Sequence, residues 1–250
     1  MPTHRVSLPE LTQADYLYHL GITSDGAKEK YGDVKFVCCG GSAKRMTGFA
    51  NDLAADLGLG PVAPMGKTDR FTWFKVGPVI VSSHGMGMPS ISILLHEVTK
   101  LLKYAEATDV MYFRLGSSGG IGVPPGTVVL TTEAMDGEVK PQFTLPILGK
   151  LVSRPTKIDE SLVDELEACA KEGADVIGVA RGRTMGTDCF YEGQGRLDGA
   201  ICDYTEADKL AFLDKLKEAG VMNIEMEAGV FASFTNHLGI RGAVCCVTLL

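Results

Sequence analysis

Short apolar runs rich in β-branched residues alternate with helical patterns along most of this chain. Residues 34–39 predict a buried strand, followed by a glycine turn and a helix that runs to about Leu57. Residues 110–115 predict another strand, and residues 223–226 lead into a helix that continues through His237. This alternation is typical of an α/β sheet layered with helices.

Other segments fit the same class. Residues 71–76 and 79–83 predict two strands joined by a tight turn. Apolar residues at helical spacing follow Pro89, which suits the first turn of a helix because proline lacks the N–H that is unsatisfied there. Thr205 and Asp208 have the spacing of a capping box, which predicts the start of a helix.

The chain contains no internal repeat, linker or low-complexity tract, so we expect a single domain over residues 1–250. A further amphipathic helix should begin at Asp159. Residues 243–250 predict a buried strand and include two final leucines. A strand as apolar as this one ordinarily continues into a segment that covers it. We therefore expect the natural chain to be longer.

Composition excludes several classes of protein. A 250-residue chain that is 45% hydrophobic, with mixed charge, indicates a folded globular protein. Its net charge of −7 gives no general attraction to nucleic acid or to an anionic membrane. No apolar run approaches the length of a membrane span, and the first residues lack the apolar stretch of a secretory signal. The seven cysteines include no Cys-x-x-Cys pair, so we expect reduced thiols and a cytoplasmic protein.

Two strand-to-loop junctions are candidates for an anion site. Gly41 precedes a helix start that contains Arg45, and free N–H groups at a helix start favour an anion. The glycine pattern is neither a dinucleotide fingerprint nor a Walker loop, and its spacing alone favours a plain strand-to-helix turn. Arg114 interrupts an apolar strand, so it needs either a structural salt bridge or a bound phosphate that the Ser117 hydroxyl also contacts.

Residues 190–196 combine an amide, a guanidinium and two aromatic rings in a turn with two glycines. Gln194 can donate and accept hydrogen bonds, whereas Arg196 can only donate. The pair suits a planar ring with two carbonyls and one N–H, such as uracil, which Phe190 or Tyr191 could stack against. The alternative is an ordinary polar surface loop.

Glu225 and Glu227 lie two residues apart, so in an extended strand both would point to one face. Two such carboxylates could accept hydrogen bonds from a vicinal diol such as that of ribose, or they could be solvated surface acids. His19 and His84 give weak signals individually, since a lone histidine is more often structural. No His/Cys/Asp spacing indicates a metal site.

In order along the chain, these positions resemble the uridine phosphorylases of the nucleoside phosphorylase-I family, most closely the animal type. The resemblance covers nearly the whole chain. It rests on an ordered set of motifs: Tyr18-His19-Leu20-Gly21, Gly40-Gly41-Ser42 with Arg45, Thr68-Asp69-Arg70, Ser83-His84-Gly85-Met86-Gly87, Arg114-Leu115-Gly116-Ser117-Ser118-Gly119-Gly120, Phe190 to Arg196, and Ile224-Glu225-Met226-Glu227.

The resemblance implies a single-domain mixed β-sheet, distorted and barrel-like, flanked by helices. It implies the reversible phosphorolysis of uridine to uracil and ribose 1-phosphate, a pentosyltransferase reaction of pyrimidine salvage. Inorganic phosphate would be a co-substrate, with no cofactor and no metal. The family's animal members resemble dimers, so a homodimer is expected, with no nucleic-acid or membrane partner.

Residue roles follow from the same resemblance. Phosphate would be held by Gly41, Arg45, Arg114 and Ser117, joined by Arg70 of the neighbouring subunit. Uracil would be recognised by Phe190, Gln194 and Arg196. Ribose would be held by Glu225, Met226 and Glu227, with His19 reaching across the dimer to the 5′-hydroxyl. Arg45, Arg114 and Glu227 would be the catalytic residues.

Alternatives within the same fold are a purine-type phosphorylase or a nucleosidase. Gln194 and Arg196 argue against purines, and the set of arginines argues against a nucleosidase. An alternative of another class is a catalytically silent paralogue that binds nucleosides without turning them over. Relatives continue past the position of Leu250 into a segment near the base pocket. A protein without that segment could be inactive, so the silent paralogue stays open as an alternative.

Overall fold

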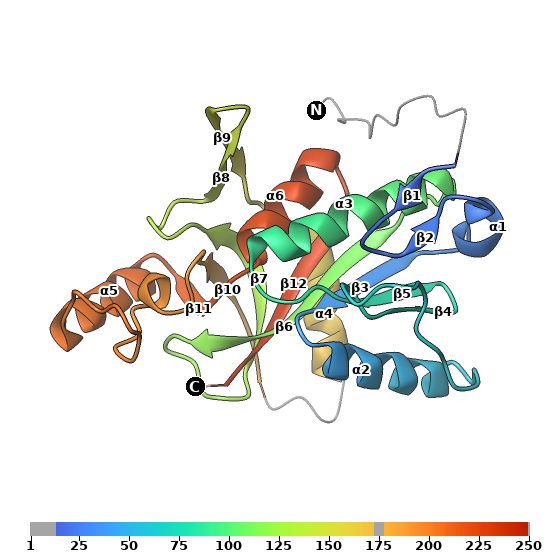
Figure 1. The fold of residues 1–250 in the computed structure, drawn as a ribbon. Coiled ribbons are helices and arrows are strands. Elements are labelled where there is room, and N and C mark those ends of the chain that lie inside the picture. The colour runs from blue at the N-terminus through green and yellow to red at the C-terminus, as the bar shows by residue number, and fades with distance from the viewer. Residues whose placement is uncertain (1–13, 173–177, 250) are drawn as a thin grey trace. The chain divides into compact units, whose positions relative to one another are not determined.

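A computed structural model describes residues 14–172 and 178–249. The described chain packs into two compact units (Figure 1). The first unit ends at Leu115 and also includes Leu238–Arg241. The second comprises Gly116–His237 and the chain from Gly242 onwards. The N-terminal residues on which the absence of a secretory signal was argued lie outside the described residues.

The first unit is built on a mixed sheet. β3 (Phe36–Gly40) pairs in parallel with β5 (Val79–Ser83) on one side and with the first half of β6 (Met111–Gly120) on the other. β4 (Trp73–Val76) is antiparallel to β5 and forms with it the hairpin that the sequence predicted. The strand predicted at residues 110–115 is longer than expected, because β6 continues to Gly120.

Helices complete the first unit. α2 (Ala43–Asp56) buries Met46, Ala50 and Ala54, whose spacing of four residues places them on one face. They pack against side chains of β3, β4 and β5: Cys38, Phe74, Val76, Val79 and Val81. α3 (Met88–Tyr104) carries the predicted apolar stripe and has Pro89 in its first turn. The described part of the unit begins with the short strands β1 (Tyr16–Leu17) and β2 (Ile22–Thr23), followed by α1 (Ala27–Tyr31).

The second unit contains a closed ring of strands. β11 (Val221–Glu225), β10 (Val179–Gly186), β7 (Val128–Met135), β12 (Gly242–Thr248) and β6 are neighbours in this order. β11 also pairs with the end of β6, so the ring closes. The distorted, barrel-like sheet is therefore confirmed, although the sequence pattern did not predict β7 or β10.

A chain of buried polar side chains crosses the inside of this ring. Thr184 donates to Asn223 Oδ1 at 2.7 Å, so its oxygen accepts from Thr131, also at 2.7 Å. Asn223 Nδ2 then donates to Ser118 Oγ at 3.0 Å, and Ser118 donates to the carbonyl of Val247 at 3.4 Å. Each of the ring's strands supplies one member, so the polar groups satisfy one another inside an apolar core.

The remaining elements of the second unit surround the ring. They are the hairpin β8 (Gln142–Ile147) with β9 (Lys150–Pro155), which the sequence pattern missed, α4 (Glu160–Glu172), the 3-10 turn η1 (Glu192–Gln194), α5 (Glu206–Glu218) and α6 (Ala228–Leu238). The two predicted helix starts are confirmed. Asp159 Oδ1 accepts from the N–H of Leu162 at the start of α4, and Thr205 forms a reciprocal capping box with Asp208 at the start of α5.

Candidate active site

Two of the phosphate candidates lie just beyond the carboxyl end of β3. Gly41 follows β3 directly, and Arg45 is an exposed residue in the first turn of α2. Ser42 caps this helix by accepting from the Arg45 N–H at 3.3 Å. The free N–H groups and the dipole of α2 therefore face the turn that contains Gly41, an arrangement that favours an anion.

Gly41 allows a close approach between two turns. A side chain at this position would place its Cβ 3.0 Å from the carbonyl oxygen of Gly85, in the turn after β5. The two turns are also joined by a hydrogen bond from the His84 N–H to the Gly40 carbonyl, at 2.8 Å. A backbone surface rich in glycine therefore borders the start of α2.

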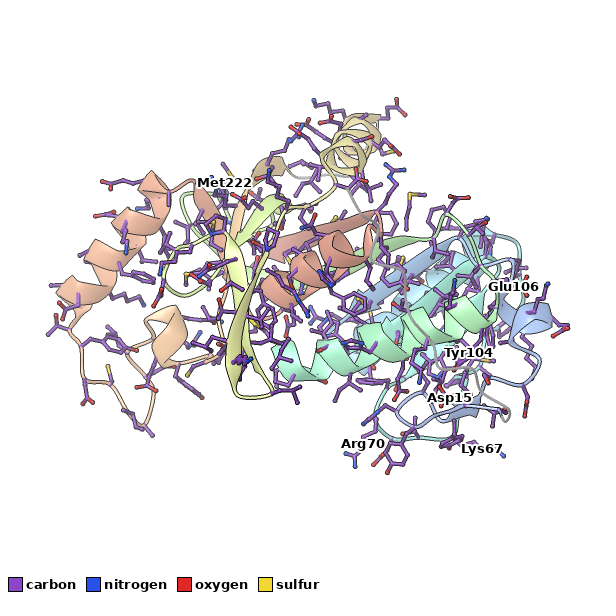
Figure 2. All side chains as sticks on the ribbon, turned by 90° about the horizontal axis from the view of Figure 1, so that it is seen from above. Asp15, Lys67, Arg70, Tyr104, Glu106 and Met222 are labelled. Carbon is purple, nitrogen blue, oxygen red and sulfur yellow. The ribbon has the colours of Figure 1, made fainter. Side chains whose placement is uncertain are left out.

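Arg114 and Arg70 have opposite environments. Arg114 lies opposite Cys39 in the β6–β3 register, and its side chain is only 2% exposed. Arg70 lies at the surface of the first unit (Figure 2) and makes a 3.8 Å contact with Asp69 that both side chains share with solvent. Such an exposed pair contributes little, so Arg70 is available to another anion. Ser117, further along β6, is half-buried in the second unit.

The base-recognition segment of the second unit is compact. The Arg196 guanidinium lies over the Phe190 ring, 4.4 Å from its centroid, a cation–π arrangement. Asp198 holds the same guanidinium at 3.3 Å, and this hydrogen bond lowers the pKa of the Asp198 carboxyl. Gln194 Nε2 is 3.5 Å from the Thr187 hydroxyl. The structure thus brings Phe190 and Arg196 together and fixes the direction of the guanidinium.

Backbone contacts fix the turn beneath these side chains. Gly195 has φ of 63°, a left-handed conformation that favours glycine. Tyr204, which sequence reasoning missed, donates from its hydroxyl to the Arg196 carbonyl at 2.6 Å. Backbone N–H groups, chiefly that of Gly193, bind the Cys189 thiol and lower its pKa. Neither contact has a sequence signal, because each depends on how the loop folds back.

The prediction that Glu225 and Glu227 extend from one face of a strand is wrong. β11 ends at Glu225, and α6 begins at Ala228, so Glu227 lies in the turn between them. The Glu225 carboxylate accepts from the N–H of Glu227 at 2.9 Å and from that of Ala228 at 2.8 Å. It therefore caps α6, because the first N–H groups of a helix lack partners within the helix. Glu227 is buried, and Met226 is half-buried.

His19 lies in the turn after β1. Its Nδ1 is 2.6 Å from a carboxylate oxygen of Glu97 on α3. Glu97 was not predicted as a functional residue, although a lone acid among the apolar residues of a helix is a visible signal.

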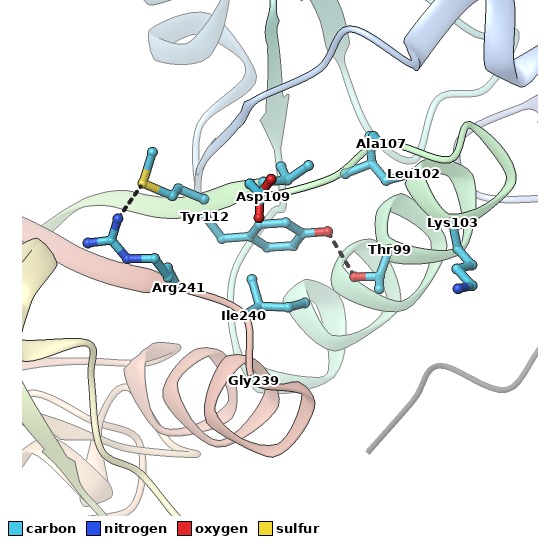
Figure 3. Close-up of a pocket in the computed structure, with 11 residues that line it drawn as sticks. Thr99, Leu102, Lys103, Ala107, Asp109, Tyr112, Gly239, Ile240 and Arg241 are labelled. Atoms are coloured by element: carbon cyan, nitrogen blue, oxygen red, sulfur yellow. Dashed lines mark hydrogen bonds between the residues drawn. The ribbon is translucent and has the colours of Figure 1, made fainter. Parts of the chain in front are cut away.

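A cavity of about 520 Å³ lies in the first unit, and no predicted site residue lines it (Figure 3). Thr99, Tyr112, Ile240 and Arg241 are among the residues that line it. The Tyr112 hydroxyl is bonded to Thr99 Oγ1 at 3.0 Å, and burial raises the pKa of this phenol. A buried tyrosine with a hydrogen-bond partner of this kind is a structural feature.

Within the described residues, no group of three or more His, Cys, Asp or Glu side chains could hold a metal ion. No helix among them is long and apolar enough to cross a membrane.

The model of the phosphorylase superfamily matches residues 35–249, a range that covers most of both units. The chain therefore belongs to the phosphorylase superfamily.

Three similar proteins all carry the name of one class within this superfamily, uridine phosphorylase. Uridine phosphorylase 2 of Homo sapiens is 48% identical over 248 residues, which are 96% of this chain and 78% of that protein. The crystal structure of uridine phosphorylase from Schistosoma mansoni in complex with thymidine superposes with a TM-score of 0.91 at 43% identity, covering 94% of this chain and 82% of the other. Inactive uridine phosphorylase B of Schistosoma mansoni is 42% identical, covering 97% of this chain and 83% of that protein.

Proposed function

We propose that this protein catalyses the reversible phosphorolysis of uridine to uracil and ribose 1-phosphate, as a pentosyltransferase of pyrimidine nucleoside salvage. Its relatives named uridine phosphorylase support the reaction class. The observation that carries the choice of base is the geometry of residues 190–196, where Arg196 is held between Asp198 and the Phe190 ring.

The base segment would act on the leaving group. As the bond between C1′ and the base nitrogen breaks, its electron pair passes to the pyrimidine, which becomes anionic. Donors from Gln194 and Arg196 to the ring carbonyls then strengthen, so they favour the transition state over bound uridine. Loss of one such donor typically costs about 10²–10³-fold in rate.

The phosphate group would be held by Gly41, Arg45, Arg114 and Ser117, and by Arg70 of a second subunit. Positive charge develops on the ribose as the glycosidic bond breaks, as in glycoside hydrolysis. A phosphate oxygen placed beneath C1′ stabilises this charge and forms the new bond. Arg45 and Arg114 are catalytic in this scheme because they orient the attacking anion.

The ribose would be held by Met226 and Glu227. Glu227 follows the capped start of α6, so its backbone is fixed by Glu225. Glu227 would accept a hydrogen bond from a ribose hydroxyl, and Glu225 would contribute by holding the turn. His19 of a second subunit would contact the 5′-hydroxyl, which requires a homodimer.

Phosphate is the only other reactant in this reaction, so we propose that no organic cofactor and no metal takes part. We also propose a cytoplasmic location, on the ground of the seven cysteines and the absence of any Cys-x-x-Cys pair.

A second candidate is a catalytically silent nucleoside-binding protein, because a relative that is 42% identical is named inactive. The two candidates differ in turnover alone. The protein should therefore be incubated with uridine, with and without inorganic phosphate, while uracil and ribose 1-phosphate are followed. Products only in the presence of phosphate support the phosphorylase. Uracil without phosphate indicates a nucleosidase, and binding without any product indicates the silent protein.

Substitution locates the phosphate site in the same assay. Arg114→Ala should remove phosphate-dependent turnover. The control is Arg183→Ala, which removes an arginine of the second unit that pairs with Glu133 at 3.2 Å. Phosphate dependence that survives Arg114→Ala unchanged contradicts the assignment of Arg114.

Specificity for uracil has its own test. Cytosine carries an amino group where uracil carries a carbonyl, so it would place a donor against a donor. Sites built on hydrogen bonds reject such mismatches by about 10⁴–10⁵-fold. Comparable turnover of uridine and cytidine contradicts the roles proposed for Gln194 and Arg196.

A further inference from the structure

Glu97 makes an unusually complete set of contacts with the turn that carries His19. Its Oε2 accepts from the backbone N–H groups of His19 and Leu20, each at 2.9 Å. Its Oε1 lies 2.6 Å from His19 Nδ1. The Glu97 side chain is only 14% exposed, so these contacts are largely shielded from water.

These contacts determine which ring nitrogen of His19 carries a proton. An ionised carboxylate has no proton to donate, so Glu97 is the acceptor in each of its contacts with this turn. His19 Nδ1 must therefore be the donor. In the neutral ring, Nε2 then keeps its lone pair and can accept a hydrogen bond.

Aromatic neighbours restrict the ring further. The Tyr18 ring meets the imidazole edge to face at 5.1 Å, and the Phe71 ring lies at 6.3 Å. The His19 side chain is nevertheless 32% exposed. Nε2 lies on the side of the ring away from Glu97, so a hydroxyl can reach it.

One face of α3 anchors the whole turn. Glu97, Lys100 and Tyr104 are three and four residues apart, which places them on one side of the helix. Lys100 pairs with Asp15. The Tyr104 hydroxyl donates to Asp15 Oδ2 at 3.0 Å, and both residues are labelled in Figure 2. The backbone before His19 is thus held by Lys100 and Tyr104, whereas Glu97 alone of the three contacts the imidazole.

We propose that Glu97 is a positioning residue that orients His19 and fixes its tautomer, so that Nε2 accepts a hydrogen bond from the ribose 5′-hydroxyl. This inference rests on the proposed function, which gives His19 that contact. It assigns to Glu97 the selection of nucleosides that carry a free 5′-hydroxyl.

The test compares uridine with 5′-deoxyuridine, which lacks only that hydroxyl. Glu97→Ala should lower kcat/KM for uridine about 10-fold, which corresponds to one lost hydrogen bond. It should leave kcat/KM for 5′-deoxyuridine within about twofold, since that substrate never makes the contact. Retained turnover of 5′-deoxyuridine also shows that the variant folds.

Two further variants separate positioning from a general structural role. Tyr104→Phe removes an anchor of the same segment from the same helix face without touching the His19 ring, so it should not change the ratio between the two substrates. Glu97→Ala should cause no additional loss of uridine preference in a His19→Ala protein, because the two residues act through one contact.

Equal losses of kcat/KM on both substrates after Glu97→Ala, or losses that add in the double variant, overturn the role of Glu97. The proposed function fails in a different way, by an absence of phosphate-dependent turnover in the unmodified protein. In that case, dissociation constants for uridine and 5′-deoxyuridine measured by calorimetry apply the same comparison to binding. A protein that binds the two equally overturns the inference.

A spectroscopic measurement needs no substrate. The ¹⁵N signals of the His19 ring, assigned among the five histidines by their loss in His19→Ala, report the tautomer. At a pH where the ring is neutral, the unmodified protein should show the proton on Nδ1. Glu97→Gln keeps the size of the side chain. The glutamine oxygen must accept from the backbone N–H groups, so the glutamine NH₂ faces His19 Nδ1. Nδ1 must then act as an acceptor, and the ring proton should move to Nε2. A proton on Nε2 in the unmodified protein overturns the inference.

Discussion

Replacing Glu225 with glutamine tests whether this residue is a helix cap or a ribose ligand. The carboxylate is 4% exposed and accepts two backbone N–H groups at the start of α6, at 2.9 and 2.8 Å. Glutamine has nearly the same shape, but it offers one acceptor oxygen and one NH₂ group. One backbone N–H would then face another donor.

The magnitude follows from these contacts. A hydrogen bond to a charged group contributes about 1.5–3 kcal/mol, and one between neutral groups about 0.5–1.5 kcal/mol. Glu225→Gln loses one charged bond and weakens the other, while removal of a helix cap alone costs about 0.5–2 kcal/mol. We expect a loss of about 2–3 kcal/mol in the free energy of unfolding. For a chain of this size, that corresponds to a fall in Tm of about 5–10 °C.

The assay pairs urea denaturation with turnover of uridine, using Glu227→Gln as the matched control. Both variants remove one buried carboxylate, and the two positions are two residues apart. Glu225→Gln should lower the denaturation midpoint strongly. Glu227→Gln should lower kcat/KM for uridine by a larger factor than the factor by which it lowers the equilibrium constant for folding. A Glu225→Gln protein with an unchanged midpoint and a weakened affinity for ribose would show that the cap argument is wrong.

Other expected outcomes test separate parts of the molecule. Thr184→Val leaves its partner Asn223 without a buried donor, so the free energy of unfolding should fall by about 2–4 kcal/mol in urea melts. Asp15→Asn should destabilise the protein by about 1 kcal/mol at neutral pH. A hydrogen bond from Lys100 holds the pKa of the Asp15 carboxyl below its ordinary 3.8, so its contribution is present above that pH and is lost as pH falls through the lowered pKa; the difference between variant and parent should then vanish in acid melts. Arg196→Lys keeps the charge but loses the planar fork, and kcat/KM for uridine should fall about 10–100-fold in steady-state kinetics.

The elements that the sequence predicted well are those with a local physical signal. The stripe after Pro89, the capping box of Thr205 and the start of α4 at Asp159 each involve residues within a few positions of one another, and all three are confirmed. β7 and β10 were missed, because their apolar residues mix with polar ones such as Thr131 and Thr184, which are satisfied inside the closed ring. The β8–β9 hairpin was also missed; its strands pair with each other in a separate two-stranded sheet. Expectations of a single domain and of a dimer stay predictions.

The candidate site was predictable in residue type but not in geometry. The ordered motifs selected residues 190–196, and the structure brings Arg196 onto Phe190 there. The sequence did not show that Glu225 caps α6, which leaves the proposed ribose contact to Glu227, because these roles depend on where β11 ends. Glu97 was missed for a related reason, since it lies 78 positions from His19 in the sequence. Roles that depend on two distant segments have no signal in the spacing of either one.

The polar chain inside the second unit has a consequence for how that unit opens. From Thr131 through Thr184, Asn223 and Ser118 to Val247, every hydrogen bond is donated in the same direction. Sliding β10, β11 or β6 by one residue breaks two of these links, and sliding β7 or β12 breaks one, so every partly slipped ring leaves buried polar groups without partners. The strands should therefore open and close together, and their amide hydrogens should exchange with solvent at one shared rate rather than strand by strand.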